Sequence, residues 1–368
     1  MERFGLVGLP NAGKSSLYNA LTNGAALAAP YPFATKDPNI GVAKVLDPRL
    51  EALAEMSKTQ RTVYATVEVV DIGGLVEGAS KGEGLGNKFL ANIREVDAIV
   101  FVLRAFVDDD IPGPSDPLEH LRVVEIELAL ADLETVETRI NRAQKAARMD
   151  KSLGDEMGAL ERAQAHLSEG RPLYRAGLSK DDLELLAPHF LLTTRQVLAV
   201  VNVAEDALDT IPEMEARVRA ELAPPGSASE HNIEVLGMSV QLEAEAAQLT
   251  GQDRIDMLEA LGLGEGALPR MIRSAYHLLG LRTYFTTGEK KLAHGHLMPA
   301  QKHQSAQERF TPTCNAASFA PTSLHGTNCW KLVRGTKPKT WARFALKAKT
   351  TKWSTATCLK FATTARQP

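Results

Sequence analysis

Cysteine is scarce in this chain of 368 residues. Only three cysteines occur, Cys314, Cys329 and Cys358. Their spacing matches no zinc-binding pattern such as C-x-x-C. Because none precedes residue 314, the first 290 residues need no disulfide bond.

Long apolar runs are also missing. No stretch of 18 residues is continuously apolar, so we expect no membrane span. Residues 1–3 lead directly into the first apolar segment, so we expect no secretory leader. These two absences predict a cytoplasmic protein, and the length predicts roughly two to three domains.

Acidic residues almost vanish from the C-terminal part of the chain. Residues 291–368 hold 13 Lys and Arg and a single acid, Glu308, whereas residues 1–290 hold 29 Lys and Arg and 44 Asp and Glu. Because the first 290 residues are acidic and contain no helix-turn-helix pattern, we expect no specific DNA binding. The composition therefore divides the chain near Lys290.

A phosphate-binding loop follows the first apolar run. Residues 8–15 match the pattern G-x-x-x-x-G-K-[ST] between an expected strand and an expected helix. In such loops the backbone N–H groups surround the phosphates, and the helix N-terminus favours negative charge. We expect Lys14 to reach the β- and γ-phosphates and Ser15 to bind Mg²⁺. The predicted nucleotide contacts are Asn11, Ala12, Gly13, Lys14, Ser15 and Ser16.

Two downstream elements are typical of switch GTPases. The expected strand 62–71 ends in the D-x-x-G pattern formed by Asp71 and Gly74. Asp71 can hold Mg²⁺ through water, and the Gly74 N–H can sense the γ-phosphate. Thr35, in the proline-rich loop 31–38, is the candidate third magnesium ligand, although a loop threonine can also simply cap a turn.

The base-reading residues differ from those of guanine-specific proteins. The expected buried strand 197–201 ends in Asn202, and the pattern N-K-x-D is altered to Val203 and Glu205 at its second and fourth positions. The longer carboxylate misplaces the two acceptors that guanine requires, so adenine becomes acceptable. Ser239, at the end of a later strand, fits the last loop that touches the base.

These motifs together resemble the YchF subfamily of Obg-like ATPases. The resemblance covers residues 1–290. It implies an α/β fold with a P-loop G domain, an inserted α-helical coiled-coil hairpin and a C-terminal TGS domain of β-grasp type. It also implies a translation-factor-class protein that hydrolyses ATP in preference to GTP, requires Mg²⁺, and binds the ribosome and its large subunit. The matching segments are 8–16, 31–38, 71–79, 82–86, 202–205 and 284–290.

The catalytic water has no obvious partner. Ras-like enzymes carry a water-orienting glutamine at the position of Leu75. In the family a histidine in the loop after the next strand compensates, but residues 106–114 contain none. The nearest is His120, which can swing into the site or be an ordinary surface residue, and the surface interpretation is favoured. Lys14 and Gly74 are the predicted catalytic residues, and the water-positioning group stays unassigned.

An inserted helical hairpin is expected between the Asp71 and Asn202 motifs. Apolar residues from Val123 through Ile126 to Ala147 recur every three or four positions, and a second helix follows at 156–169. Charged residues near the turn could contact RNA phosphates, or they could form a solvated face. These residues are Arg142, Lys145, Arg148 and Lys151.

The segment after Lys290 departs from the family. One explanation is a basic RNA-binding extension. We favour a frameshift. Synonymous codons can be chosen for residues 293–297 and 314–321 so that translation in a frame shifted by two bases gives peptides that resemble the family sequence at these places. The TGS domain would then be truncated and the tail poorly ordered. The predicted domains are 1–116 and 191–275 (G domain), 117–190 (helical insertion), 276–290 (start of the TGS domain) and 291–368 (tail).

The leading functional hypothesis is a monomeric, Mg²⁺-dependent, ATP-hydrolysing switch that associates with the large ribosomal subunit. Two alternatives remain open. The first is an Obg-class GTPase used in ribosome assembly, which comparison of ATP and GTP binding would distinguish. The second is a non-catalytic, nucleotide-gated scaffold, which single-turnover hydrolysis would distinguish.

Overall fold

The computed structural model describes residues 2–23, 40–73, 85–108, 113–147, 154–223, 233–286 and 292–297. The chain forms two units. The first comprises Met1–Leu46 and Thr66–Leu279, and the second comprises Asp47–Ala65 and Gly280–Pro368. Within the described ranges, no helix combines the length and apolar character that crossing a membrane requires.

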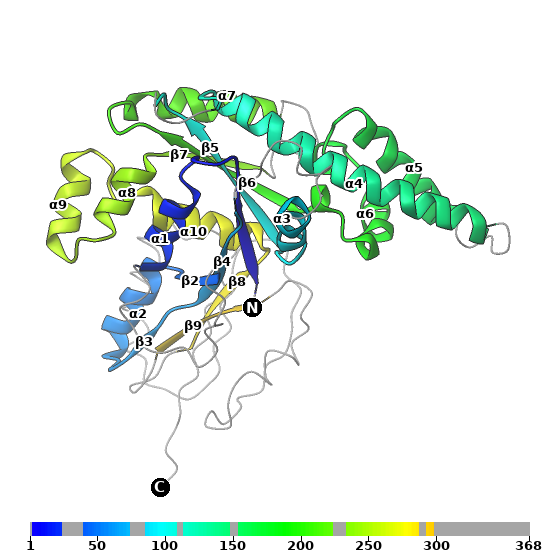
Figure 1. The fold of residues 1–368 in the computed structure, drawn as a ribbon. Helices are drawn as coiled ribbons and strands as arrows, with labels where there is room; N and C mark the ends of the chain where they lie inside the picture. The colour runs from blue at the N-terminus through cyan, green and yellow to red at the C-terminus, as the bar shows by residue number, and fades with distance from the viewer. Residues whose placement is uncertain are drawn as a thin grey trace, which may run out of the picture. The chain divides into compact units, whose positions relative to one another are not determined.

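A six-stranded, mostly parallel sheet forms the centre of the first unit (Figure 1). The strand order is β2-β4-β1-β5-β6-β7, and only β2 runs antiparallel to its neighbour. The inner strands are buried along almost their whole length, as expected when helices cover both faces of a parallel sheet. The expected α/β class with flanking helices is therefore confirmed. The strands are β1 Arg3–Val7, β2 Ile40–Lys44, β4 Thr66–Asp71, β5 Ala98–Ala105, β6 Gln196–Val203 and β7 Glu234–Met238.

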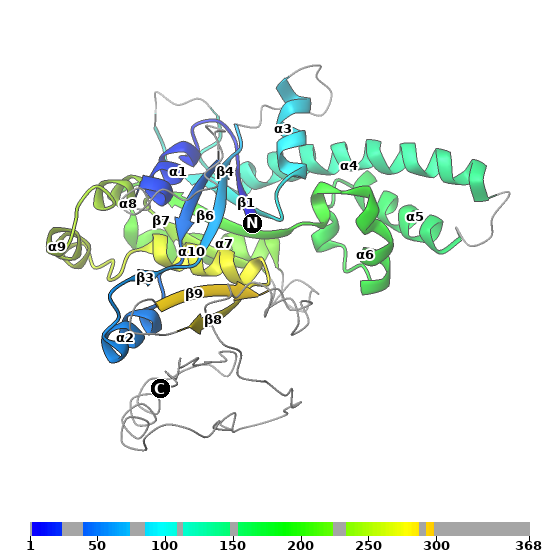
Figure 2. The same cartoon turned by 90° about the horizontal axis from the view of Figure 1, so that it is seen from below.

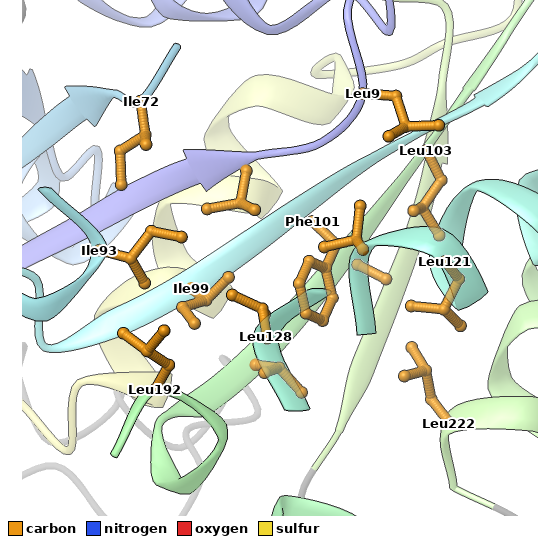
Figure 3. Close-up of a cluster of buried hydrophobic side chains, with 14 of the residues drawn as sticks. Leu9, Ile72, Ile93, Ile99, Phe101, Leu103, Leu121, Leu128, Leu192 and Leu222 are labelled. Atoms are coloured by element: carbon orange, nitrogen blue, oxygen red, sulfur yellow. The ribbon is translucent and has the colours of Figure 1, made fainter. Parts of the chain in front are cut away.

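The main core lies between this sheet and the first turns of a long helix, α4 (Pro117–Ala147). Phe101 and Leu103 of β5 belong to the same buried cluster as Leu121 and Leu128 of α4 (Figure 3). Leu9, from the loop after β1, joins this cluster. The other helices of the sheet domain are α1 Lys14–Asn23, α3 Leu85–Arg94, α7 Ile211–Leu222, α8 Val240–Ala246, α9 Gln252–Ala260 and α10 Ala267–Leu278.

Beyond the sheet, α4 continues beside α5 (Gly154–Ser168), as both ribbon views show (Figures 1 and 2). A second buried cluster, which includes Val136, Ile140 and Leu160, joins the two helices. The short helix α6 (Lys180–Leu186) packs against α5. Of the basic residues expected at the turn, Arg142 is exposed, Arg148 and Lys151 lie outside the described residues, and the side chain of Lys145 is also undescribed.

The expected apolar face of α4 was wrong at Ile126. Ile126 is 48% exposed, whereas Val124, Leu128 and Ala129 are buried. The helix packs there against β5 on one side and against the Leu192–Thr194 3-10 helix on another. Its buried face is consequently wider than, and rotated from, the single stripe that periodicity indicates.

The second unit is built from two segments that lie far apart in the sequence. It contains α2 (Pro48–Ser57), β3 (Thr62–Val63), β8 (Arg282–Thr286) and β9 (Leu292–Leu297). The strand order is β3-β9-β8, with β8 and β9 antiparallel. Leu50 and Leu53 of α2 form a small buried cluster with Phe285 of β8.

This arrangement differs from the division expected from the sequence. Residues 47–65, assigned above to the first part of the G domain, group with the C-terminal unit. Residues 276–278 still belong to α10 in the first unit, and the second unit resumes only at Gly280. The stretch 292–297, expected within a poorly ordered tail, forms a paired strand. Residues 298–368 lie outside the described residues.

Candidate nucleotide-binding site

The phosphate loop lies between β1 and α1, at the carboxyl edge of the sheet. Gly13 has φ +98°, and Asn11 adopts φ +60°, a conformation that asparagine tolerates better than most residues. A Cβ on Gly8 would come within 2.4 Å of the Val102 carbonyl oxygen. Glycine is therefore required at position 8 because the loop touches the backbone of β5, and at position 13 because the chain turns left-handed.

Lys14 is a buried cation at the start of α1. Only 6% of the residue is exposed, and its Nζ donates to the Leu9 carbonyl oxygen at 2.7 Å. Burial lowers the pKa of Lys14 to about 8, although the nearby Asp71 carboxylate opposes this shift. The ammonium is thus held inside the loop in a poorly solvated position where an anionic ligand would stabilise it.

Ser15 and Asp71 meet at the ends of two sequence-distant elements. The Ser15 hydroxyl donates to Asp71 Oδ2 at 2.9 Å, and the buried Oδ1 of the same carboxylate has no hydrogen-bond partner within the described structure. Hydroxyl and carboxylate oxygens suit Mg²⁺, which takes few protein ligands when phosphates complete its shell. The two residues therefore fit a magnesium ion. The other predicted contacts, Thr35 and Gly74, lie outside the described residues, as does Leu75.

Asn202 connects the phosphate loop to the base-reading side of the site. Its Nδ2 donates to the Ala12 carbonyl oxygen, and its Oδ1 accepts from the Val240 N–H, both at 3.0 Å. Ser239 precedes α8 and is 3% exposed, and its Oγ makes no hydrogen bond to the described residues. Val203 is buried, whereas Glu205 is exposed just beyond the end of β6.

The favoured interpretation of His120 as a surface residue was wrong. His120 is 1% exposed, because the first turns of α4 pack onto β5. Its Nδ1 accepts from the Arg104 backbone N–H at 3.5 Å. Burial, together with the charges of Arg104 and Lys14, lowers the pKa of His120 to about 4. The neutral ring carries its proton on Nε2, so in this arrangement His120 cannot accept a proton from water.

This pKa predicts an effect on acid stability. The unfolded chain protonates His120 near pH 6.5, whereas the folded protein does so only near pH 4. Lowering the pH from 7 to 5 therefore favours unfolding through this residue by about 2 kcal/mol. A His120→Asn variant lacks this contribution, so urea unfolding should reveal a smaller loss of stability over this interval than in the wild type. Equal losses would contradict the assignment.

The motifs did not indicate Arg104, a buried cation next to the last residue of the inner strand β5. The signal was present in the sequence, because β5 is apolar except for this one residue. The motifs also did not indicate Asp132, which anchors α4. Asp132 accepts three hydrogen bonds, from the Leu192 N–H and from the N–H and Oγ1 of Thr193. A lone acid in a helical pattern gives no such signal.

Comparisons with known proteins agree with this geometry. The family described as "50S ribosome-binding GTPase" matches residues 3–142. The chain is 44% identical to the ribosome-binding ATPase YchF of Haemophilus influenzae over 292 residues, which cover 78% of each chain. It is 42% identical to the protein of the same name in Bacillus subtilis, covering 78% of this chain and 79% of that one. The solved structure of the Schizosaccharomyces pombe YchF GTPase superposes with a TM-score of 0.71 at 31% identity, covering 83% of this chain and 82% of the other.

Proposed function

This chain belongs to the YchF family, and from that premise we propose that it is a Mg²⁺-dependent P-loop NTPase that hydrolyses ATP in preference to GTP and associates with the ribosome. The observation that carries the proposal is the convergence of Lys14, Ser15 and Asp71 at one end of the sheet. A cation, a hydroxyl and a carboxylate in this arrangement are the groups that bind a magnesium–triphosphate complex.

The residues have distinct roles in this proposal. Lys14 leaves the Leu9 carbonyl oxygen and pairs with the phosphates, while the loop N–H groups from Asn11 to Ser16 surround them. Ser15, and Asp71 through a water molecule, would hold Mg²⁺, and the ion would neutralise phosphate charge. Thr35 and Gly74 are proposed to respond to the γ-phosphate, so that hydrolysis releases their loops. The water-positioning group is unassigned.

Preference for ATP is proposed from the end of β6. Glu205 and Val203 stand where guanine-specific proteins carry Asp and Lys. A Val203→Lys/Glu205→Asp double variant should therefore raise the affinity for GTP relative to ATP by about tenfold, since a correctly placed bidentate acceptor is worth one or more kcal/mol. Calorimetric titration with each nucleotide measures the ratio. An unchanged ratio would contradict the proposed base selection, and tighter GTP binding by the wild type would defeat it.

A GTPase is the second candidate, because the matching family and the S. pombe relative are both described as GTPases. Direct comparison of ATP and GTP hydrolysis on the purified full chain separates the two. Single-turnover measurements separate either enzyme from a non-catalytic scaffold. If no phosphate is released in a single turnover with either ATP or GTP, the scaffold is favoured.

Ribosome association is proposed from the names of the bacterial relatives, which describe them as ribosome-binding. The large subunit is the proposed partner, and the protein is proposed to act as a monomer in the cytoplasm. Co-sedimentation with separated ribosomal subunits, with ATP, ADP or no nucleotide, tests this directly. Equal pelleting with both subunits in every nucleotide state would contradict it.

The frameshift after about residue 290 is also retained as a proposal, together with the division into G domain, helical insertion and truncated TGS domain. It is supported by the compositional break near Lys290. Sequencing the gene tests the frameshift, because an alternative reading frame should encode an amino-acid sequence similar to the family's beyond codon 291. Absence of such a sequence in both other frames would favour a genuine basic extension.

A further inference from the structure

Arg104 is a fully buried cation near the end of an otherwise apolar strand. It is 2% exposed and ranks among the largest buried side chains of the described chain. Removing a guanidinium from water is costly unless its N–H groups find acceptors. The hydrogen bonds that Arg104 makes therefore indicate what the residue does.

Its guanidinium folds back onto the turn that follows β5. Nε donates to the Phe106 carbonyl oxygen at 3.0 Å, and a terminal nitrogen donates to the Asp108 carbonyl oxygen at 3.4 Å. The guanidinium carbon lies 5.0 Å from the centre of the Phe106 ring. Between the two held carbonyls, Val107 is 79% exposed. Arg104 thus clamps a short turn from inside the protein.

The clamped turn begins at the nucleotide-binding edge. β1 ends at Val7, which pairs with Phe101, so the rest of β5 extends past β1 and runs beside the phosphate loop. Arg104 is paired in register with Asn202, and Ala105 with Val203. The turn of residues 106–108 therefore starts between the phosphate loop and the base-reading residues. The charges of Arg104 and Lys14 also both act on His120, which places the two cations in one neighbourhood.

We propose that Arg104 is a positioning residue for nucleotide binding, which holds the turn of residues 106–108 in place as a preformed side of the site. This inference rests on the proposed function. Arg104 acts through the backbone carbonyls of the turn, not through contact with the phosphates. Preforming a wall of a binding site lowers the ordering cost of binding, so its loss weakens the ligand without altering the groups at the phosphates.

The test compares two substitutions in the full chain, Arg104→Lys and Arg104→Met. Both should raise the KM for ATP and the dissociation constant of ATP by about tenfold, with kcat changed by less than about threefold. The KM of Arg104→Lys should be as high as that of Arg104→Met, because a single ammonium cannot donate hydrogen bonds to two carbonyl oxygens in the geometry of a guanidinium. Wild-type KM in Arg104→Met would overturn the proposal. Recovery of KM in Arg104→Lys would also overturn it, since charge alone would then suffice.

A matched control removes a partly buried arginine, Arg175, away from this edge. Arg175 pairs with Glu125 at 3.4 Å and donates to the Glu221 carbonyl oxygen. Arg175→Met should lower the unfolding temperature and leave the KM for ATP unchanged. If Arg175→Met raises KM as much as Arg104→Met does, general loss of stability explains both effects and the proposal fails.

A measurement on the wild type covers the case in which the Arg104 variants do not fold. The Arg104 Nε–H should give a slowly exchanging NMR resonance in the nucleotide-free protein, and ATP should leave it protected. Protection that develops only with ATP would overturn preorganisation of the turn. A wild type that neither binds nor hydrolyses ATP or GTP would defeat the proposed function itself, whereas a functional wild type with unaffected variants would defeat only the role of Arg104.

Discussion

Replacing Lys14 with methionine is expected to abolish measurable ATP hydrolysis and to lower ATP affinity by about 100-fold or more, which corresponds to about 2.7 kcal/mol. The reason is that the Lys14 ammonium is buried inside the phosphate loop. Burial disfavours its charged form, as the pKa of about 8 indicates, so a phosphate group that binds there stabilises the charge. Methionine has similar length and keeps the apolar stem packed. Calorimetric titration and phosphate-release assays measure the two effects.

The same substitution should not destabilise the nucleotide-free protein. Burial is the larger influence on the Lys14 pKa and disfavours its charged form, so removing the charge removes a desolvation cost. Thermal unfolding without nucleotide should therefore occur at the wild-type temperature or slightly above it. Lys180→Met, on the exposed surface of α6, is the matched control and should change neither binding nor stability. If Lys14→Met still binds ATP with wild-type affinity, the phosphate loop is not part of the nucleotide-binding site.

Replacing Asp132 with alanine is expected to cost about 3 kcal/mol or more of folding free energy, because each buried donor left without an acceptor costs about 1–3 kcal/mol. The Asp132 carboxylate is 1% exposed and accepts from the Leu192 N–H at 2.8 Å and from the Thr193 N–H and Oγ1 at 2.7 and 2.6 Å. Alanine leaves all three donors inside the protein without this acceptor. Urea unfolding followed by circular dichroism measures the loss.

Two further variants serve as controls for the Asp132→Ala prediction. Asp132→Asn keeps one acceptor oxygen and should lose less stability than alanine. Glu134→Ala lies on the exposed side of the same helix and should change stability by less than about 0.5 kcal/mol. If Asp132→Ala and Glu134→Ala are equally stable, the carboxylate does not hold α4 to the chain before β6.

The sequence anticipated features that depend on local chemistry. The phosphate loop and Asp71 each carry a recognisable pattern at a strand end, and parallel strands bring their carboxyl ends to one edge. The Ser15 hydroxyl and the Asp71 carboxylate therefore lie within hydrogen-bonding distance of each other, and their role as magnesium ligands stays a prediction. Asn202 is positioned for the same reason, since it follows the apolar run 197–201 of β6 and lies next to the last residue of that strand.

Features set by tertiary packing were not anticipated. His120 looked like a surface residue because nothing local indicates that the first turns of α4 lie against β5. Ile126 was assigned to the wrong face because α4 contacts several elements at once. The membership of residues 47–65 in the C-terminal unit depends on β3 pairing with β9, and a two-residue strand carries almost no pattern of its own.

That pairing has a consequence for the order in which the chain folds during synthesis. Thr62 can pair with Leu292, its partner in the sheet, only after residue 292 has been synthesised. At common translation rates of about 5–20 residues per second, this takes about 10 to 45 s. Until Phe285 emerges, Leu50 and Leu53 of α2 lack the partner that completes their cluster. The early segment therefore remains a site for chaperone capture or misfolding until the last strands of the second unit have been made.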